Sequence, residues 1–109
     1  MNDLVLEKKE KYGELLSVYG QLLPASVLRR MKLYYYDDLS IGEIADNEEV
    51  SRAAVYDSLV SGEKSLDSYE NKLHLYEKRN ELLSLADSLE EKGLKEEADK
   101  IREVTDYGI

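Results

Sequence analysis

Five neighbouring positions carry the side chains best suited to binding chemistry in this sequence. Ser51, Arg52, Ala53, Tyr56 and Asp57 fall on the outer side of a short predicted helix that follows a tight turn. Residues at the start of the second helix of a helix-turn-helix contact base edges, and a helix N-terminus such as the one at Ser51 can bind a phosphate. Among these five residues, Arg52 is the one with a positively charged side chain long enough to extend into a groove. These five residues are therefore the candidates for nucleic-acid binding.

The sequence contains no arrangement typical of an enzyme or a metal site. His74 is the only histidine, and cysteine is absent. A catalytic histidine needs a nucleophile or an orienting carboxylate around it, and a zinc site needs several ligands. Adjacent acidic residues do not face each other on a helix, so we interpret as solvating charge the pairs Asp37-Asp38, Glu48-Glu49, Glu90-Glu91 and Glu96-Glu97. We expect His74 to be structural, and we expect no catalytic residue, no metal and no cofactor.

A helix-turn-helix between residues 39 and 62 is the element that would position the five candidates. Ser40 and Glu43 have the spacing of a capping box, in which each side chain bonds the backbone N–H of the other residue. Ser51 occupies the same capping position before the second helix. The two helices are predicted at residues 41–47 and 52–61. Gly62 is expected to break or bend the chain after them.

All-α is the fold class that the composition predicts. Helix-forming residues dominate, one proline occurs, and strand-like alternation of Val, Ile and Thr is missing. The other helices are predicted at residues 2–22, 24–36, 63–91 and 95–105. Lys92-Gly93 is a typical helix end, so a helical hairpin should follow the long helix. We therefore expect an N-terminal bundle over residues 1–62, and a long helix with a C-terminal hairpin over residues 63–109, packed on the same single domain.

Three consecutive tyrosines occupy positions 34 to 36. They do not all face one core, because each residue of a helix turns by about 100°. We expect two rings in the core and one partly exposed; the alternative is a platform on which a ligand or a base stacks.

A heptad-like seam runs along the predicted long helix. Its residues are Leu66, Tyr69, Leu73, Tyr76, Asn80 and Leu83, spaced alternately by three and four. Asn80 falls at an a position, where asparagine can fix the register of a dimer. The seam predicts a homodimer; the alternative is that Asn80 simply faces solvent.

The charge balance is unusual for a protein with a helix-turn-helix. The chain has a net charge of −9, and residues 40–62 hold five acidic residues against Arg52 as the one base, a net charge of −4. Binding to DNA depends largely on Lys and Arg against phosphate. No apolar run approaches the roughly 20 residues that a membrane helix needs, and the N-terminus is unlike a signal peptide. We expect a cytoplasmic protein.

Three strings resemble the YlxM family of small bacterial proteins: LYYYDDLSIGEIA, VSRAAVYDSL and YENKLHLYEK. The resemblance covers residues 12–78. It implies an all-helical fold whose helix-turn-helix is similar to region four of bacterial sigma factors. It also implies a role beside the signal recognition particle, because the family's genes lie next to the gene for that particle's GTPase.

The sequence departs from the family pattern at the places that matter for DNA. Ala53 replaces a glutamine, the side chain best able to read an adenine edge. Glu48 and Glu49 stand in the turn where the family has an apolar residue and then Gly or Asn, and a glutamate at the left-handed position strains the turn. Three hypotheses remain open: an accessory protein that binds the protein or RNA of the particle, a DNA-binding transcriptional regulator, and a structural dimerisation module.

Overall fold

The computed structural model describes residues 3–106, and every regular element in that range is helical. The elements are α1 (Asp3–Tyr19), the 3-10 turn η1 (Gly20–Leu22), α2 (Ala25–Tyr35), α3 (Ile41–Glu48), α4 (Arg52–Leu73), α5 (Leu75–Glu91) and α6 (Lys95–Thr105). The predicted all-α class is confirmed. The predicted parts 1–62 and 63–109 include residues 1–2 and 107–109, which lie outside the described residues. No helix in the described range is long and apolar enough to cross a bilayer.

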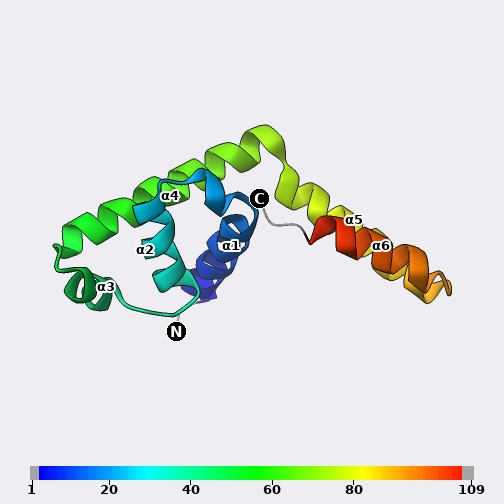
Figure 1. The fold of residues 1–109 in the computed structure, drawn as a ribbon, viewed down its shortest axis with the longest axis horizontal. Coiled ribbons are helices and arrows are strands. Elements are labelled where there is room, and N and C mark those ends of the chain that lie inside the picture. Colours follow the sequence, from blue (N-terminus) through cyan, green and yellow to red (C-terminus); the bar gives the residue numbers. More distant parts are fainter. Residues whose placement is uncertain (1–2, 107–109) are drawn as a thin grey trace.

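A bundle of four helices forms the body of the molecule. Helix α4 runs along one side of α1, α2 and α3, while α5 and α6 project away from them as an arm (Figure 1). The longest dimension is therefore 54 Å, against 29 and 22 Å for the other two. The core lies inside the bundle, where side chains of α1 to α4 are buried, among them Leu15, Tyr19, Met31, Ile44, Val55 and Leu66.

The tyrosine run divides between the core and the surface, as the helical step requires. Tyr34 and Tyr35 pack against the core and meet edge to face, with ring centroids 5.0 Å apart. Tyr36 keeps 47% of its surface exposed, and its hydroxyl donates to the Gly13 carbonyl at 3.0 Å. The expected pair of core rings with one exposed ring is confirmed.

The break predicted at Gly62 is wrong, because α4 continues through this position to Leu73. Gly62 is buried, and a Cβ atom there would lie 3.0 Å from Val27 Cγ1 and from the end of Met31. The glycine therefore serves the close approach of α2 to α4. The predicted boundary between residues 62 and 63 falls inside this helix.

The long helix predicted over residues 63–91 is also wrong, because the chain turns sharply at His74. His74 adopts the left-handed conformation, with φ 56°, and separates α4 from α5. Glu70 accepts hydrogen bonds from the backbone N–H groups of Tyr76 and Glu77, at 3.0 and 3.2 Å. The Tyr19 hydroxyl accepts the N–H of Leu75 at 3.0 Å. These bonds satisfy the first N–H groups of α5, which a continuous helix would bond internally.

The arm is the predicted hairpin of α5 and α6. Gly93 adopts φ 83°, and Leu94 N–H bonds the Leu89 carbonyl at 2.9 Å, which is the pattern of a Schellman motif. The guanidinium of Arg102 on α6 then contacts the carboxylates of Asp87 and Glu90 on α5, at 2.8 and 3.1 Å. Helix α6 packs mainly on α5, and α5 contacts α1 at the base of the arm.

Candidate nucleic-acid interface

The helix-turn-helix consists of α3, a turn at Glu49 and the first turns of α4. The predicted capping box is present at the start of α3: Glu43 N–H bonds Ser40 Oγ at 3.1 Å, and Ser40 N–H bonds Glu43 Oε1 at 3.0 Å. The Ser40 N–H donates to the carboxylate and is the largest cause that lowers the pKa of Glu43, and the Ser40 side chain lowers it further. Glu49 adopts φ 56° and ψ 44°, the left-handed conformation expected at this turn.

The five predicted site residues are brought together at the start of α4, and all five are exposed. Ser51 caps the helix and accepts the Ala54 N–H at 3.0 Å. Arg52, Ala53, Tyr56 and Asp57 lie on the first two turns, and Tyr56 exposes 57% of its surface. The surface they form is small, polar and aromatic. We call these five residues the recognition face; that they bind a nucleic acid stays a prediction.

Arg52 lies against α3 as well as towards solvent. A Cβ atom at Gly42 would be 3.0 Å from Arg52 Nη2, so the glycine makes room for the guanidinium. Among residues 3–106, Arg52 forms no ion pair with a carboxylate. The guanidinium therefore keeps donors for a ligand.

Two arginines of α2 reach the helix-turn-helix, but they are already paired within the chain. Arg29 Nη2 contacts Glu48 Oε1 at 2.7 Å, and Arg30 Nε lies 3.3 Å from both Glu48 oxygens. Arg30 also donates to Ser58 Oγ at 2.7 Å, and that hydroxyl donates to the Ala54 carbonyl. One carboxylate thus ties α2 to the end of α3 and, through Arg30, to α4.

The prediction that Glu48 is a solvent-facing charge is therefore wrong. Its side chain and that of Arg30 are each 15% exposed. The hydrogen bond from Arg29 is the largest cause that lowers the pKa of Glu48; desolvation opposes it and Arg30 adds to it. Sequence reasoning missed Arg29 and Arg30, because their contacts with residue 48 span 19 and 18 residues of chain, respectively.

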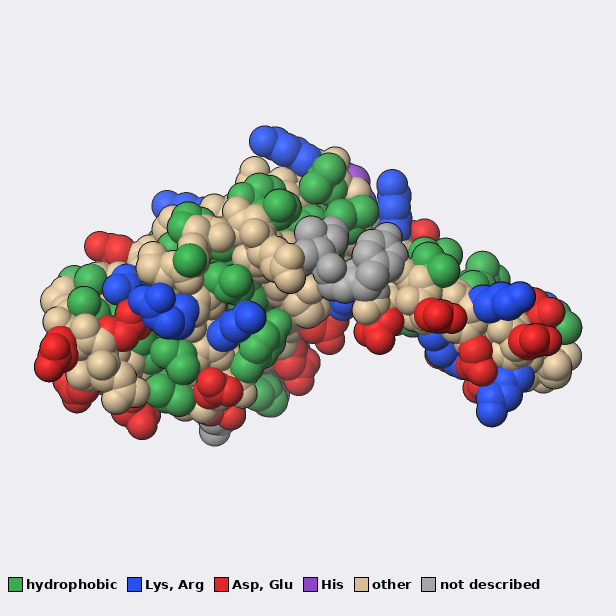
Figure 2. Space-filling model, in the orientation of Figure 1, with side chains coloured by type: hydrophobic (Ala, Val, Ile, Leu, Met, Phe, Trp, Pro, Cys, Tyr) green, Lys and Arg blue, Asp and Glu red, His purple; other side chains and the backbone are tan. Residues whose placement is uncertain are grey.

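The paired arginines leave little positive charge for a phosphate backbone. On the recognition face Arg52 is opposed by Asp57, and Asp46 and Glu49 are exposed nearby. Figure 2 shows acidic and basic side chains interspersed over this part of the bundle, without a broad basic surface on the face in view. Proteins that bind duplex DNA usually make several such phosphate contacts.

The six residues of the predicted dimer seam are placed on two helices by the bend at His74. Leu66 is fully buried in the core of its own chain, and the Tyr69 ring packs against Tyr19 with centroids 5.7 Å apart. Leu73 ends α4 with 45% of its surface exposed. The other three residues, Tyr76, Asn80 and Leu83, lie on α5. A single straight coiled-coil seam is therefore ruled out in this conformation.

A group of potential metal ligands surrounds the bend. Glu70, His74 and Glu77 present ligand atoms within 4.8 Å of one another. Both Glu70 oxygens already accept backbone N–H bonds from α5, and His74 Nδ1 lies 3.3 Å from Glu77 Oε2. The group is explained by capping of α5, and we assign it no metal.

Comparison with known proteins places the chain in a family. Residues 6–106 match the model of the UPF0122 family, described as "Putative helix-turn-helix protein, YlxM / p13 like". The chain belongs to this family. The UPF0122 match extends beyond residues 12–78, which carry the resemblance in the sequence, and it includes the arm.

Curated relatives agree with this assignment. A UPF0122 protein of Exiguobacterium sibiricum is 41% identical over 87% of the chain and 90% of the relative. One of Bacillus pumilus is 48% identical over 73% of the chain and 76% of the relative, and one of Limosilactobacillus fermentum is 51% identical over 65% and 63%. Family membership supports the presence of a helix-turn-helix. The family description names no binding partner, so we infer the partner from the chemistry of the surface.

Proposed function

We propose that this protein is a regulatory or accessory protein that uses the recognition face to bind the protein or the RNA of the signal recognition particle, in the cytoplasm. The link to the particle rests on the YlxM resemblance. The proposal assigns no catalysis to the chain.

The observation that carries the proposal is the pairing of Arg29 and Arg30 with Glu48. This pairing occupies two basic side chains that reach the helix-turn-helix, and Arg52 is the one base among the five residues of the recognition face. Such a face suits a partner that is contacted through a few hydrogen bonds and the Tyr56 ring. Single-stranded RNA, whose bases stack on aromatic side chains, and protein surfaces are partners of this kind.

A binding assay at low ionic strength tests the proposal. Tagged protein should retain the purified particle protein or its RNA, and an Arg52→Ala, Tyr56→Ala variant should retain about tenfold less, as expected when an arginine and an aromatic contact are lost. An Asn71→Ala variant, altered at an exposed position near the end of α4, should bind like the unmodified chain. Retention of neither component by the unmodified chain would refute the proposal.

A DNA-binding regulator is the second candidate, and it is favoured by the Arg52 guanidinium, which forms no ion pair with the carboxylates of residues 3–106. If the recognition face reads DNA, Arg52→Ala should weaken binding and reduce the slope of log affinity against log salt by about one. A gel shift with genomic fragments at low salt measures both. No retained fragment at low salt would exclude this candidate.

A homodimer is a further proposal, restricted by the bend to the exposed part of the seam. Leu73 and Asn80 are exposed and Leu83 is partly exposed, whereas Leu66 is occupied within the chain. Sedimentation of the chain and of an Asn80→Leu variant tests this contact. A monomer in both cases at high concentration would exclude a dimer through these residues.

A further inference from the structure

A groove separates the bundle from the base of the arm. Its walls are α1 on one side and α5 on the other, with the C-terminal end of α2 between them, and its volume is about 790 Å³. The bend at His74 sets α5 at an angle to the bundle (Figure 1), and the lining residues come from α1, α5 and the C-terminal end of α2. Arg79 Nη1 donates to Ser17 Oγ at 3.3 Å, which holds the two walls together at the closed end.

The groove has an apolar floor. Leu6 and Tyr36 line the groove and are each 47% exposed, and Leu83 is partly exposed on the opposite wall. The Tyr36 ring lies beside Gly13, where an added Cβ atom would be 3.8 Å from the ring, an ordinary contact distance. Exposed leucine and tyrosine side chains of this kind mark an interaction surface when they line a concave site.

Carboxylates surround this floor. Glu10 and Glu14 stand on α1 and Asp38 follows α2, and all three line the groove and are exposed. No Lys or Arg of the described range forms an ion pair with Glu10 or Glu14. In Figure 2, acidic side chains gather along the lower edge where the bundle meets the arm.

The two bases in the groove are engaged within the chain. Lys9 Nζ lies 3.6 Å from Asp38 Oδ1 and 4.5 Å from the centre of the Tyr34 ring. Arg79 bonds Ser17 and lies 5.7 Å from the Tyr76 ring centre. Neither base forms an ion pair with Glu10 or Glu14, and the groove lining, with three carboxylates against two bases, keeps a net charge of −1.

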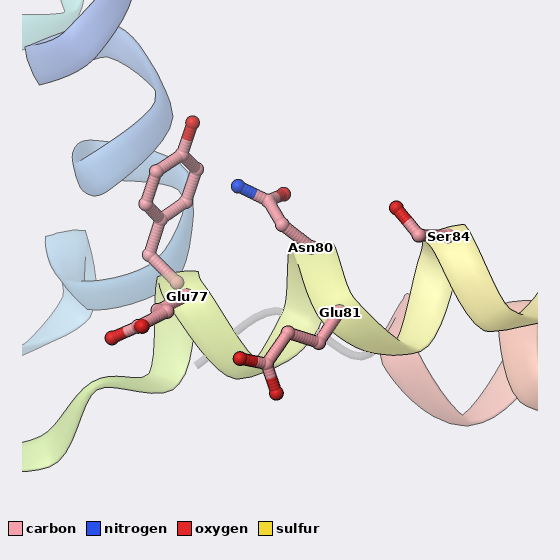
Figure 3. A pocket seen from close by; sticks show the side chains of 5 residues that line it. Glu77, Asn80, Glu81 and Ser84 are labelled. Atoms are coloured by element: carbon pink, nitrogen blue, oxygen red, sulfur yellow. The ribbon is translucent and has the colours of Figure 1, made fainter.

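The depression next to the groove continues the acidic character along α5. It is lined by Tyr76, Glu77, Asn80, Glu81 and Ser84. Figure 3 shows Asn80 and Ser84 on one side of the helix and the carboxylates of Glu77 and Glu81 on another. A ligand lying along α5 would therefore meet carboxylates beyond the groove itself.

We propose that this groove, with its Leu6, Tyr36 and Leu83 floor and its Glu10, Glu14 and Asp38 rim, docks a basic amphipathic helix of a partner protein. Helices of this kind bury an apolar face in a groove and place their charges at its rim. The acidic rim would repel a phosphate backbone, and a second copy with the same charge of −9 would bring like charges together. The groove is separate from the recognition face, so its role does not depend on binding to the signal recognition particle. It shares Asn80 and Leu83 with the dimer contact proposed above, so a helix docked here and that dimer contact exclude each other.

A synthetic peptide tests this assignment on the full chain. The probe is an amphipathic helix of Leu and Lys, about 18 residues long so that it forms a stable helix, and the matched peptide carries Glu at every Lys position. Binding is measured by fluorescence anisotropy at low ionic strength. We expect the Lys peptide to bind and the Glu peptide to fail.

Charge variants locate the site. Glu10→Gln with Glu14→Gln should weaken the Lys peptide about tenfold, because two rim charges are lost. The control, Glu91→Gln with Glu97→Gln at the tip of the arm, makes the same change in net charge and should alter binding less than about twofold. Leu6→Ser should also weaken binding, since it removes part of the floor. Circular dichroism checks that each variant is folded.

Four results would overturn the proposal. The first is no binding of the Lys peptide to the unmodified chain. The second is equal weakening by the groove and tip variants, which would indicate general charge attraction. The third is displacement of the peptide by a single-stranded oligonucleotide. The fourth is self-association of the chain that Leu6→Ser abolishes, which would assign the groove to a second copy.

Discussion

Replacement of Glu48 by glutamine should lower the free energy of unfolding more than the same replacement at an exposed glutamate. In the native chain the carboxylate receives hydrogen bonds from Arg29 and Arg30, and Arg30 also holds Ser58. Glutamine keeps the size of the side chain and removes its charge. Arg30, which is 15% exposed, then retains its charge without a counter-ion.

The size of the effect follows from the exposure of the two pairs. The Arg29 side chain is 55% exposed, so its pair with Glu48 contributes at most about 1 kcal/mol. The Arg30 pair is shielded from solvent. Loss of a hydrogen bond to a charged group costs about 1.5–3 kcal/mol of folding stability. We expect Glu48→Gln to lower the free energy of unfolding by about 2 kcal/mol.

Urea unfolding followed by circular dichroism measures this loss. Glu49→Gln is the matched control, because it removes the same charge from the next residue, which is exposed; we expect a change of less than about 0.5 kcal/mol there. Arg29→Ala should cost at most about 1 kcal/mol. Equal midpoints for Glu48→Gln and the unmodified chain would refute a stabilising role for the carboxylate.

The pH dependence gives an independent check on the same residue. The pKa of Glu48 is lower in the folded chain than its ordinary value of 4.5, chiefly through Arg29, so the unfolded chain binds more protons as the pH falls below that value. The contribution of Glu48 is therefore complete above about pH 5 and is lost as the pH falls through the folded pKa. The stability difference between the unmodified chain and Glu48→Gln should shrink on acidification. A difference that stays constant down to pH values at which Glu48 is protonated would contradict the electrostatic origin of the effect.

Three further substitutions test the turns and the close helix contact. Glu49→Gly should raise the free energy of unfolding by about 1 kcal/mol, because glycine adopts a φ of 56° without the strain of a side chain; unchanged or lower stability in urea would contradict this. Gly62→Ala should lower the free energy of unfolding by about 1 kcal/mol or more, although alanine has the better helix propensity, because the new methyl group meets Met31. A melting temperature above that of the unmodified chain would disprove the close contact. Glu70→Gln should speed hydrogen exchange of the amides at residues 76 and 77 about tenfold, since one charged acceptor is lost; unaltered exchange would show that Glu70 does not cap α5.

Local signals in the sequence predicted the features that depend on neighbouring residues. The Ser40 capping box, the Ser51 cap and the Gly93 helix end each involve groups within five residues of one another, and all three are present. The exposure of the recognition face followed from the same local pattern. The strain at Glu49 was predictable because the turn requires a left-handed residue whatever occupies it.

The errors arose where a distant residue decides the outcome. Gly62 resembles a helix break in the sequence, but its partner Met31 lies on another helix. The turn at His74 depends on Tyr19, which is more than 50 residues away and bonds both Glu70 and the start of α5. In the same way, Glu48 was interpreted as surface charge because its arginine partners lie on α2. Periodicity alone contains none of these contacts.

Because the chain bends at His74, the arm projects from the bundle and is attached to it near the base of α5. Helix α5 has 17 residues and is therefore about 25 Å long, so a tilt of about 10° at its base would move the tip by about 4 Å. The groove lies at the base of the arm. The ion pairs of Arg102 with Asp87 and Glu90 hold α6 against α5. A change in the angle between the bundle and α5 would therefore displace the tip of the arm farther than the walls of the groove.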